Sequence, residues 1–91
     1  MSKMKYSYRC NGQIIRSANR FWKFALVDSD NRVIGCSETE QILIDEKMKA
    51  LKRAEQSLEH CKQYIYELVP IYKMTVTTIK NWRVVTLEKE A

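Results

Sequence analysis

Glycine, proline and histidine are scarce in this chain, which has 2, 1 and 1 of them among its 91 residues. With only Gly12 and Gly35 present, the sequence lacks the glycine-rich loop that holds phosphates in nucleotide-binding enzymes. The single histidine, His60, lies by helical spacing on a polar face, and its neighbour Cys61 points about 100° away around the helix. We therefore expect no catalytic residues, and we expect that the protein is not an enzyme.

Close cysteine pairs and long hydrophobic runs are also missing. Cys10, Cys36 and Cys61 are odd in number and widely spaced, whereas structural zinc sites use close pairs such as C-x2-C. We expect reduced thiols, no metal and no cofactor. No apolar run follows the first lysines, and none reaches the roughly 18 residues of a membrane span. We therefore expect a cytoplasmic protein that does not interact with membranes.

The composition is that of one folded domain over residues 1–91. Hydrophobic residues make up 45% and charged residues 30%, which is too apolar for a disordered tail. Two shorter pieces would each be too small to bury a useful core. The net charge of +5 is carried by residues 1–37, which have seven Lys or Arg and two Asp. An anionic ligand is therefore expected to bind within these residues.

The first two strands are predicted by alternation and by a turn. Residues 4–10 alternate between apolar and polar side chains, which is typical of a half-buried strand. Asn11-Gly12 fits a two-residue type I′ turn, because both residue types tolerate positive φ. Residues 13–17 should therefore fold back antiparallel, with Tyr8 opposite Ile15.

Two further strands are predicted before the first helix. Residues 21–27 are rich in aromatic and apolar side chains and are interpreted as the central strand. A polar turn at 28–31 precedes the returning strand at 32–36. Gly35 indicates a bulge in that strand, or the close approach of another backbone.

A long helix is predicted over residues 38–69, which contain neither Gly nor Pro. Ser37 and Glu40 match the capping box at its start, and Pro70 marks its end. Such a helix would be about 48 Å long, at roughly 1.5 Å per residue, and would extend beyond one small sheet. The sequence leaves open whether it forms one helix or two. It favours a homodimer in which a second copy covers the overhang.

The helix carries an apolar stripe, and β-branched residues follow Pro70. The stripe comprises Ile44, Met48, Leu51, Ala54, Leu58, Cys61, Ile65 and Leu68. Residues 71–78 and 83–87 are interpreted as two strands, or as one long kinked strand. The predicted fold is α+β: an antiparallel sheet in the order β-β-β-β-α-β, with or without one more strand, and one long helix packed across one face.

The main candidate site lies where basic and aromatic residues interleave, in residues 16–24. Phosphates bind Lys and Arg, and bases stack on aromatic rings. The candidate ligand-binding residues are Arg16, Arg20, Trp22, Lys23, Trp82 and Arg83. The simpler alternative is that Trp22 and Phe24 are core residues and the cations only add solubility. The sequence does not decide which face of strand 21–27 is buried.

A second candidate surface follows the helix. Tyrosine is frequent at the centres of protein interfaces and equally at the edges of cores. The candidate interface residues are Leu51, Leu58, Tyr64, Tyr66 and Tyr72. The predicted function is a non-catalytic module that binds a nucleic acid or a nucleotide-like anion. The alternative is a small protein-interaction module, an inhibitor or adaptor that masks a protein target.

Overall fold

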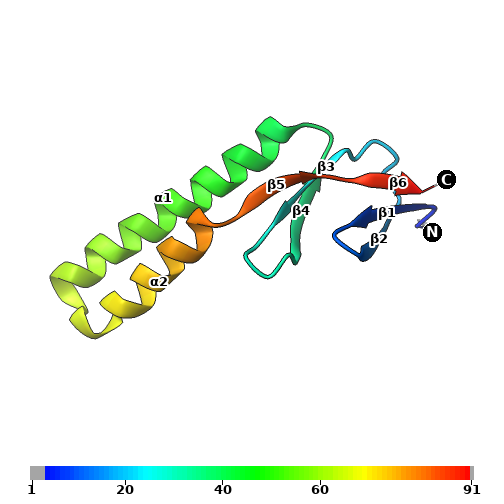
Figure 1. Cartoon of the computed structure of the whole chain (residues 1–91). Coiled ribbons are helices and arrows are strands. Elements are labelled where there is room, and N and C mark those ends of the chain that lie inside the picture. The colour runs from blue at the N-terminus through cyan, green and yellow to red at the C-terminus, as the bar shows by residue number, and fades with distance from the viewer. Residues whose placement is uncertain (1–3, 91) are drawn as a thin grey trace.

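The computed structural model describes residues 4–90 and has an α+β fold (Figure 1). Its elements are β1 (Tyr6–Cys10), β2 (Gln13–Ser17), β3 (Phe24–Val27), β4 (Val33–Ser37), α1 (Glu40–Tyr64), the 3-10 turn η1 (Tyr66–Leu68), α2 (Val69–Lys80), β5 (Arg83–Thr86) and β6 (Glu88–Glu90). The α+β class is confirmed, as are the four strands that precede the long helix and the strands that follow it.

The strands form two antiparallel three-stranded sheets, ordered β2-β1-β6 and β4-β3-β5. β5 and β6 follow one another across the two sheets (Figure 1), and the residue between them, Leu87, is buried. The main core lies between the sheets. Its buried members are Tyr8, Cys10, Ala25, Val27 and Leu87.

The first hairpin has the predicted register. Tyr8 pairs with Ile15, and the turn residues Asn11 and Gly12 have positive φ values of 48° and 79°. The Asn-Gly turn therefore fixes the register locally, as expected for a type I′ connection.

β3 is buried on both faces, because one face meets the other sheet and the opposite face meets α1. Ala25 and Val27 belong to the core between the sheets. Leu26 pairs with Gly35, and a Cβ at Gly35 would lie 3.8 Å from Leu43 Cδ2 of α1.

The bulge predicted near Gly35 is present, since Leu26 pairs with Gly35 and Val27 with Val33, which leaves Ile34 between them unpaired. The groups that approach Gly35 are the side chains of Leu43 and Glu46 in α1.

The predicted start of the long helix is wrong by two residues. Ser37 is the last residue of β4, and its Oγ accepts a hydrogen bond from the Thr39 backbone N–H at 3.3 Å. Thr39 is the N-cap and makes no side-chain cap hydrogen bond. The capping box between Ser37 and Glu40 therefore does not form, because strand pairing already positions Ser37.

The region 38–69 does not form one helix, and the strand predicted over 71–78 is wrong. α1 ends at Tyr64, and Ile65 turns the chain with φ −135° and ψ 66°. Pro70 lies in the first turn of α2 rather than after the end of a helix, a position where its missing N–H costs nothing. The β-branched residues of 71–78 are helical because Val69, Val76 and Ile79 form a buried face at helical spacing. This packing outweighs their weak helix propensity.

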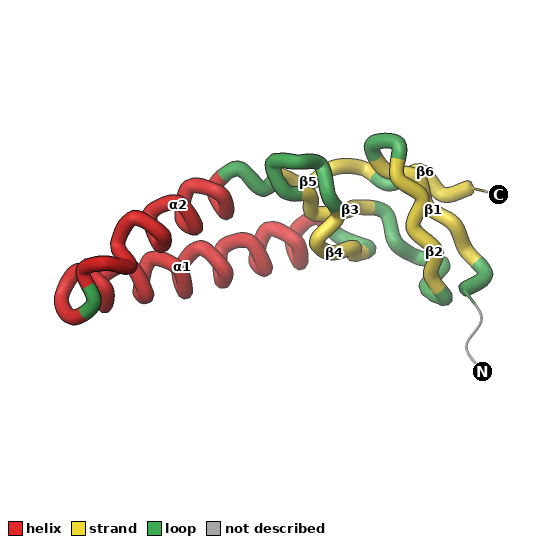
Figure 2. Tube along the Cα trace, turned by 90° about the horizontal axis from the view of Figure 1, so that it is seen from below, coloured by secondary structure: helices red, strands yellow, loops and turns green. Residues whose placement is uncertain are grey.

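α1 and α2 form a helical hairpin that projects from the sheets (Figures 1 and 2). The described molecule measures 52 × 25 × 23 Å, with a radius of gyration of 16.2 Å; about 12 Å is expected for a compact domain of this length. Leu51 and Leu58 pack against the hairpin core of Ala54, Val76 and Ile79. α2 thus supplies the cover that we expected from a second copy, and the homodimer stays a prediction.

Lys47 fastens the end of α2 to α1. Its Nζ donates to the carbonyl oxygens of Lys80 at 3.0 Å and Trp82 at 2.7 Å. These carbonyls lie at the C-terminal end of α2, where positive charge also interacts favourably with the helix dipole.

We expect Lys47→Met to lower the free energy of unfolding by about 2 kcal/mol, because two carbonyls lose a charged donor. Lys49→Met is the matched control, since Lys49 is exposed and makes no side-chain hydrogen bond within residues 4–90. Urea denaturation measures both variants. Equal losses for the two variants would show that Lys47 does not act as a cap.

Candidate anion-binding site

The loop between β2 and β3 is held by three hydrogen bonds around Asn19. The Asn19 N–H donates to Ser17 Oγ at 2.9 Å, and Asn19 Oδ1 accepts from the Phe21 N–H at 2.7 Å. The Asn19 carbonyl accepts from the hydroxyl of the buried Tyr8 at 2.5 Å. The loop is therefore anchored to the core at its centre, which places Arg20 and Phe21 at the surface.

Two cation–π pairs meet at this loop. The Arg20 guanidinium lies over the Phe21 ring, 4.7 Å from its centroid, and Lys89 Nζ lies 4.7 Å from the centroid of Tyr6. Lys89 Nζ also donates to the Arg20 carbonyl at 3.1 Å, which joins the two pairs. Lys23 follows Arg20 by three positions and is exposed, and its carbonyl accepts from the N–H of Leu87 at 2.8 Å. We call Tyr6, Arg20, Phe21, Lys23 and Lys89 the basic-aromatic cluster.

Within residues 4–90 none of the three cations of this cluster forms an ion pair with a carboxylate. Among residues 4–90 the ion pairs are Arg9 with Glu90 and Lys62 with Glu59. The cluster therefore carries three exposed cationic residues that have no ion-pair partner in the described part of the chain, and an anion can approach them.

Trp22 belongs to the core rather than to this surface. Its ring packs on Tyr8 with 5.6 Å between the centroids, and it is only half-exposed. Phe21 and Lys23 are exposed instead, and Phe21 retains 52% of its accessible surface. The simpler interpretation of Trp22 as a core residue is therefore correct, and Phe21 is the ring that a ligand can reach.

The other three predicted ligand residues lie elsewhere. Arg16 is exposed on the outer face of the β2-β1-β6 sheet, opposite Ser7. Arg83 pairs with Val27 at the far end of β3, and its guanidinium donates to the Asn31 side chain. Trp82 packs against the hairpin core. Arg20 and Lys23 are both exposed in the segment between β2 and β3, whereas these three residues lie outside it.

Sequence reasoning missed Tyr6 and Lys89. Lys89 follows Arg20 by 69 positions, and only the pairing of β6 with β1 brings the two together. No local pattern indicates that contact. Phe21 did lie in the basic-aromatic run, next to the tryptophan that we favoured.

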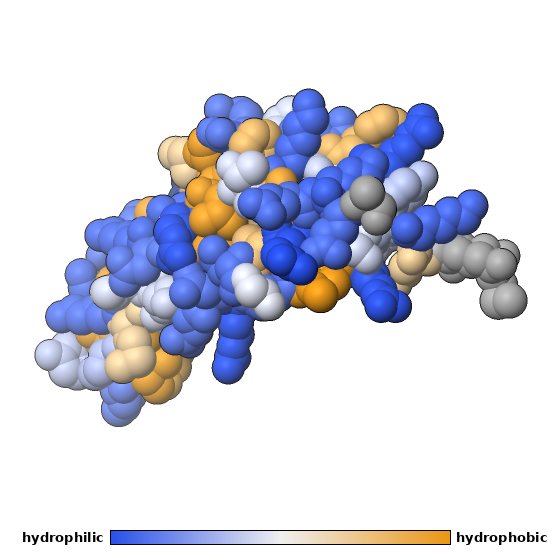
Figure 3. All heavy atoms as spheres, turned by 45° about the vertical axis from the view of Figure 1, so that its right-hand side comes forward, coloured by the Kyte–Doolittle hydropathy of each residue, from blue (hydrophilic) through white to orange (hydrophobic). Residues whose placement is uncertain are grey.

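The far end of the hairpin carries the tyrosines of the second candidate surface. Tyr64 and Tyr66 are 73% and 77% exposed, and Tyr72 is half-buried. His60 is exposed, and its ring lies 5.0 Å from that of Tyr64. Apolar side chains are also visible near this end of the hairpin in Figure 3, among mostly hydrophilic ones.

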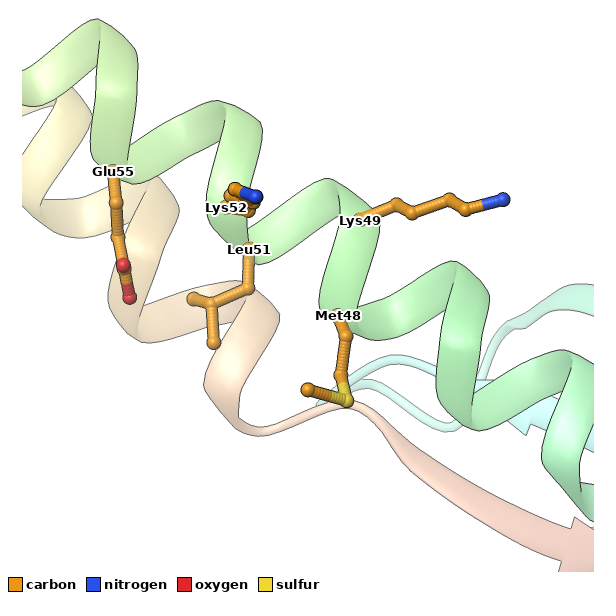
Figure 4. A pocket seen from close by; sticks show the side chains of 5 residues that line it. All are labelled: Met48, Lys49, Leu51, Lys52 and Glu55. Carbon is orange, nitrogen blue, oxygen red and sulfur yellow. The ribbon is translucent and has the colours of Figure 1, made fainter.

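A shallow groove runs along one side of α1 (Figure 4). It has a volume of about 280 Å³ and is lined by Met48, Lys49, Leu51, Lys52 and Glu55. Met48 and Leu51 point toward α2 and the segment that follows it, whereas Lys49 projects away. Polar groups do not converge in this groove as they do in ligand sites, so we place no ligand there.

The cysteines have the character of core residues. Cys10 and Cys61 are buried, and Cys36 is half-buried. Burial raises the pKa of Cys10, an effect that the charge of Arg83 partly offsets, and burial also raises the pKa of Cys36. Protonated thiols are poor nucleophiles and poor metal ligands. Residues 4–90 contain no group of three or more His, Cys, Asp or Glu that could hold a metal ion.

Neither α1 nor α2, the two α-helices in the described part of the chain, is long and apolar enough to cross a membrane. No family model, no curated protein and no solved structure matches this chain.

Proposed function

We propose that this protein is a non-catalytic binding module that holds a nucleic acid or a nucleotide-like anion on the basic-aromatic cluster. The observation that carries the proposal is the pair of linked cation–π contacts, Arg20 over Phe21 and Lys89 over Tyr6. Together with Lys23 they combine positive charge and an exposed ring, the two features that bind phosphates and bases.

The cluster is prepared for such a ligand before binding. The Asn19 hydrogen bonds fix the loop backbone, and the rings restrain the side chains of Arg20 and Lys89. Less side-chain entropy is then lost on binding than with free side chains. Stacking of a base on Phe21 would add about 1–3 kcal/mol.

The proposed mode of binding depends on charge and tolerates many sequences. Arg20, Lys23 and Lys89 would contact phosphates, while Phe21 would stack on a base of any kind. Affinity should therefore fall steeply as salt rises, because phosphate contacts release counterions. An extended single strand, whose bases are free to stack, fits this arrangement better than a duplex.

We expect the double variant Arg20→Ala/Lys89→Ala to weaken binding of a labelled single-stranded oligonucleotide about 10- to 100-fold, because two charged contacts are lost. The matched control is Lys49→Ala/Lys52→Ala, which removes the same charge from exposed positions on α1. Fluorescence anisotropy measures both. If the control loses as much affinity as the double variant, net charge alone drives binding, and the cluster is not the site.

The second candidate function is protein interaction through the far end of the hairpin. The observation that favours it is the exposure of Tyr64 and Tyr66, because tyrosine is enriched at interface hot spots. Tyr64→Ala/Tyr66→Ala should leave oligonucleotide binding unchanged if the cluster is the functional site. A partner protein that co-purifies with the wild type and is lost from this variant, in a protein that binds no oligonucleotide, would favour the second function.

A further inference from the structure

The helical hairpin has a second groove, which shares no lining residue with the one in Figure 4. It lies between α1 and the chain that returns through η1 and α2, and its volume is about 300 Å³. The polar side chains that line it are Arg53, Gln56, Ser57, His60 and Tyr72. The four from α1 follow the i, i+3, i+4, i+7 spacing that places residues on one side of a helix. Polar groups therefore converge here, as they do in ligand sites.

These polar side chains have no partner within the described part of the chain. Arg53 belongs to neither of the ion pairs found among residues 4–90, and none of the residues that line this groove is acidic. The side-chain hydrogen bonds of α1 and α2 in the same range are made by other residues. The donors of Arg53, Gln56 and Ser57 are therefore available to a ligand that carries acceptors.

The other side chains that line the groove are apolar. Cys61 is 3% exposed, Leu68 is half-buried, and Ile65 is 39% exposed. Ile65 and Leu68 belong to the connection between the two helices, so the apolar surface extends toward the far end of the hairpin. A ligand that covered it would remove this apolar surface from water, which favours binding.

The groove continues in the other direction along the helices. A neighbouring hollow of about 230 Å³ shares Arg53, Ser57 and Tyr72 with it and reaches Ile79 near the end of α2. Ala54 of α1 also lines this hollow, and its short side chain leaves space beside α2. The shared polar residues thus have apolar surface on both sides, with room for an extended apolar group.

The polar side chains are held in place before any ligand binds. Those of α1 start from one continuous helix, and the His60 ring lies 5.0 Å from the Tyr64 ring, tilted by 42°. Ser57 and Tyr72 are half-buried. Less side-chain freedom is therefore lost on binding than at fully exposed positions.

We propose that this groove binds a small monocarboxylate with an extended apolar body, such as a medium-chain fatty acid. The carboxylate accepts two parallel hydrogen bonds from the Arg53 guanidinium, and Gln56 and Ser57 donate to its remaining acceptor positions. The apolar body lies along Cys61, Ile65 and Leu68.

Charge favours a carboxylate over a phosphate. Arg53 is the lining residue that always carries a positive charge, and it matches the single negative charge of a carboxylate. A phosphate monoester carries about −1.5 to −2 at neutral pH, so part of its charge would stay unbalanced in this groove. The groove is lined by α1, α2 and their connection, whereas the basic-aromatic cluster lies on the strands and the β2–β3 loop. The inference therefore goes beyond the proposed function and is tested without any oligonucleotide.

The first test titrates the isotope-labelled protein with sodium octanoate, up to about 10 mM, and follows the backbone amides by NMR. Acetate has the same head without the chain, and octylammonium has the same chain with the opposite charge. We expect octanoate to shift amides of residues 53–61 and 65–72 in a saturable manner, with at least about tenfold higher affinity than either control. An octanoate response confined to other parts of the chain, or equal binding of acetate or octylammonium, would overturn the proposal.

Two pairs of variants test the residues. Arg53→Gln should weaken octanoate binding about tenfold or more, because the charged donor is lost, whereas Lys52→Gln removes the same charge from outside this groove and should not. Ser57→Leu keeps Arg53 but fills the groove and should also abolish the amide shifts, while Gln63→Leu, at an exposed position outside it, should not. Circular dichroism confirms that each variant is folded. The proposal is wrong if Lys52→Gln weakens binding as much as Arg53→Gln, or if folded Ser57→Leu binds octanoate like the wild type.

Discussion

Leu43→Ala lowers the free energy of unfolding by about 2–5 kcal/mol, the range for removing a buried leucine side chain. Leu43 is fully buried where α1 crosses the β4-β3-β5 sheet. Its neighbours there are Gly35 and the strand that carries Leu26. Shortening this buried side chain to alanine leaves a cavity between α1 and the sheet. Since small domains are stable by only about 5–15 kcal/mol, this is a large share of the total.

The adjacent residue provides the control for Leu43. Ile44 is 37% exposed, whereas Leu43 is fully buried. We therefore expect Ile44→Ala to lower the free energy of unfolding by less than about 1 kcal/mol. Urea denaturation followed by circular dichroism and by tryptophan fluorescence measures both. Equal losses for Leu43 and Ile44 would contradict the packing of α1 on this sheet.

Tyr8→Ala should cost about 3–5 kcal/mol, because it removes the largest fully buried side chain of the core. The Tyr8 ring packs on Trp22, and its hydroxyl donates to the Asn19 carbonyl. The substitution therefore damages both the core between the sheets and the support of the loop that carries Arg20. Thermal and urea unfolding measure the loss.

Tyr8→Phe separates these two effects. The ring stays, so the stability loss should be only about 1 kcal/mol, from one hydrogen bond. The Asn19 carbonyl is no longer held, and oligonucleotide affinity should fall although no ligand contact has been removed. Unchanged affinity together with reduced stability would show that the hydroxyl supports the core but does not position the cluster.

The parts of the fold that local signals control could be predicted from the sequence. The Asn11-Gly12 turn fixed the β1–β2 register, and alternation together with apolar content located β3. Residues 71–78 were misread because their β-branched composition resembles a strand, while the helix depends on packing against α1. That packing involves residues more than ten positions away, which a local pattern does not contain.

The candidate site was predictable to the same limited extent. Arg20 and Lys23 stand in a basic-aromatic run that the sequence displays directly. Phe21 rather than Trp22 is exposed, because Trp22 packs on Tyr8, and the order of aromatic residues does not show which face is inside. Lys89 joins the site only through the pairing of β6 with β1.

The most direct test of the proposed function is the titration of a labelled single-stranded oligonucleotide with the wild-type protein, followed by fluorescence anisotropy at about 50 and about 200 mM salt. A parallel titration with a duplex shows whether free bases matter. We predict binding at the lower salt, with a preference for the single strand, and a loss of at least about tenfold in affinity at the higher salt. The absence of binding at both salt concentrations would contradict the assignment of the basic-aromatic cluster as a nucleic-acid site.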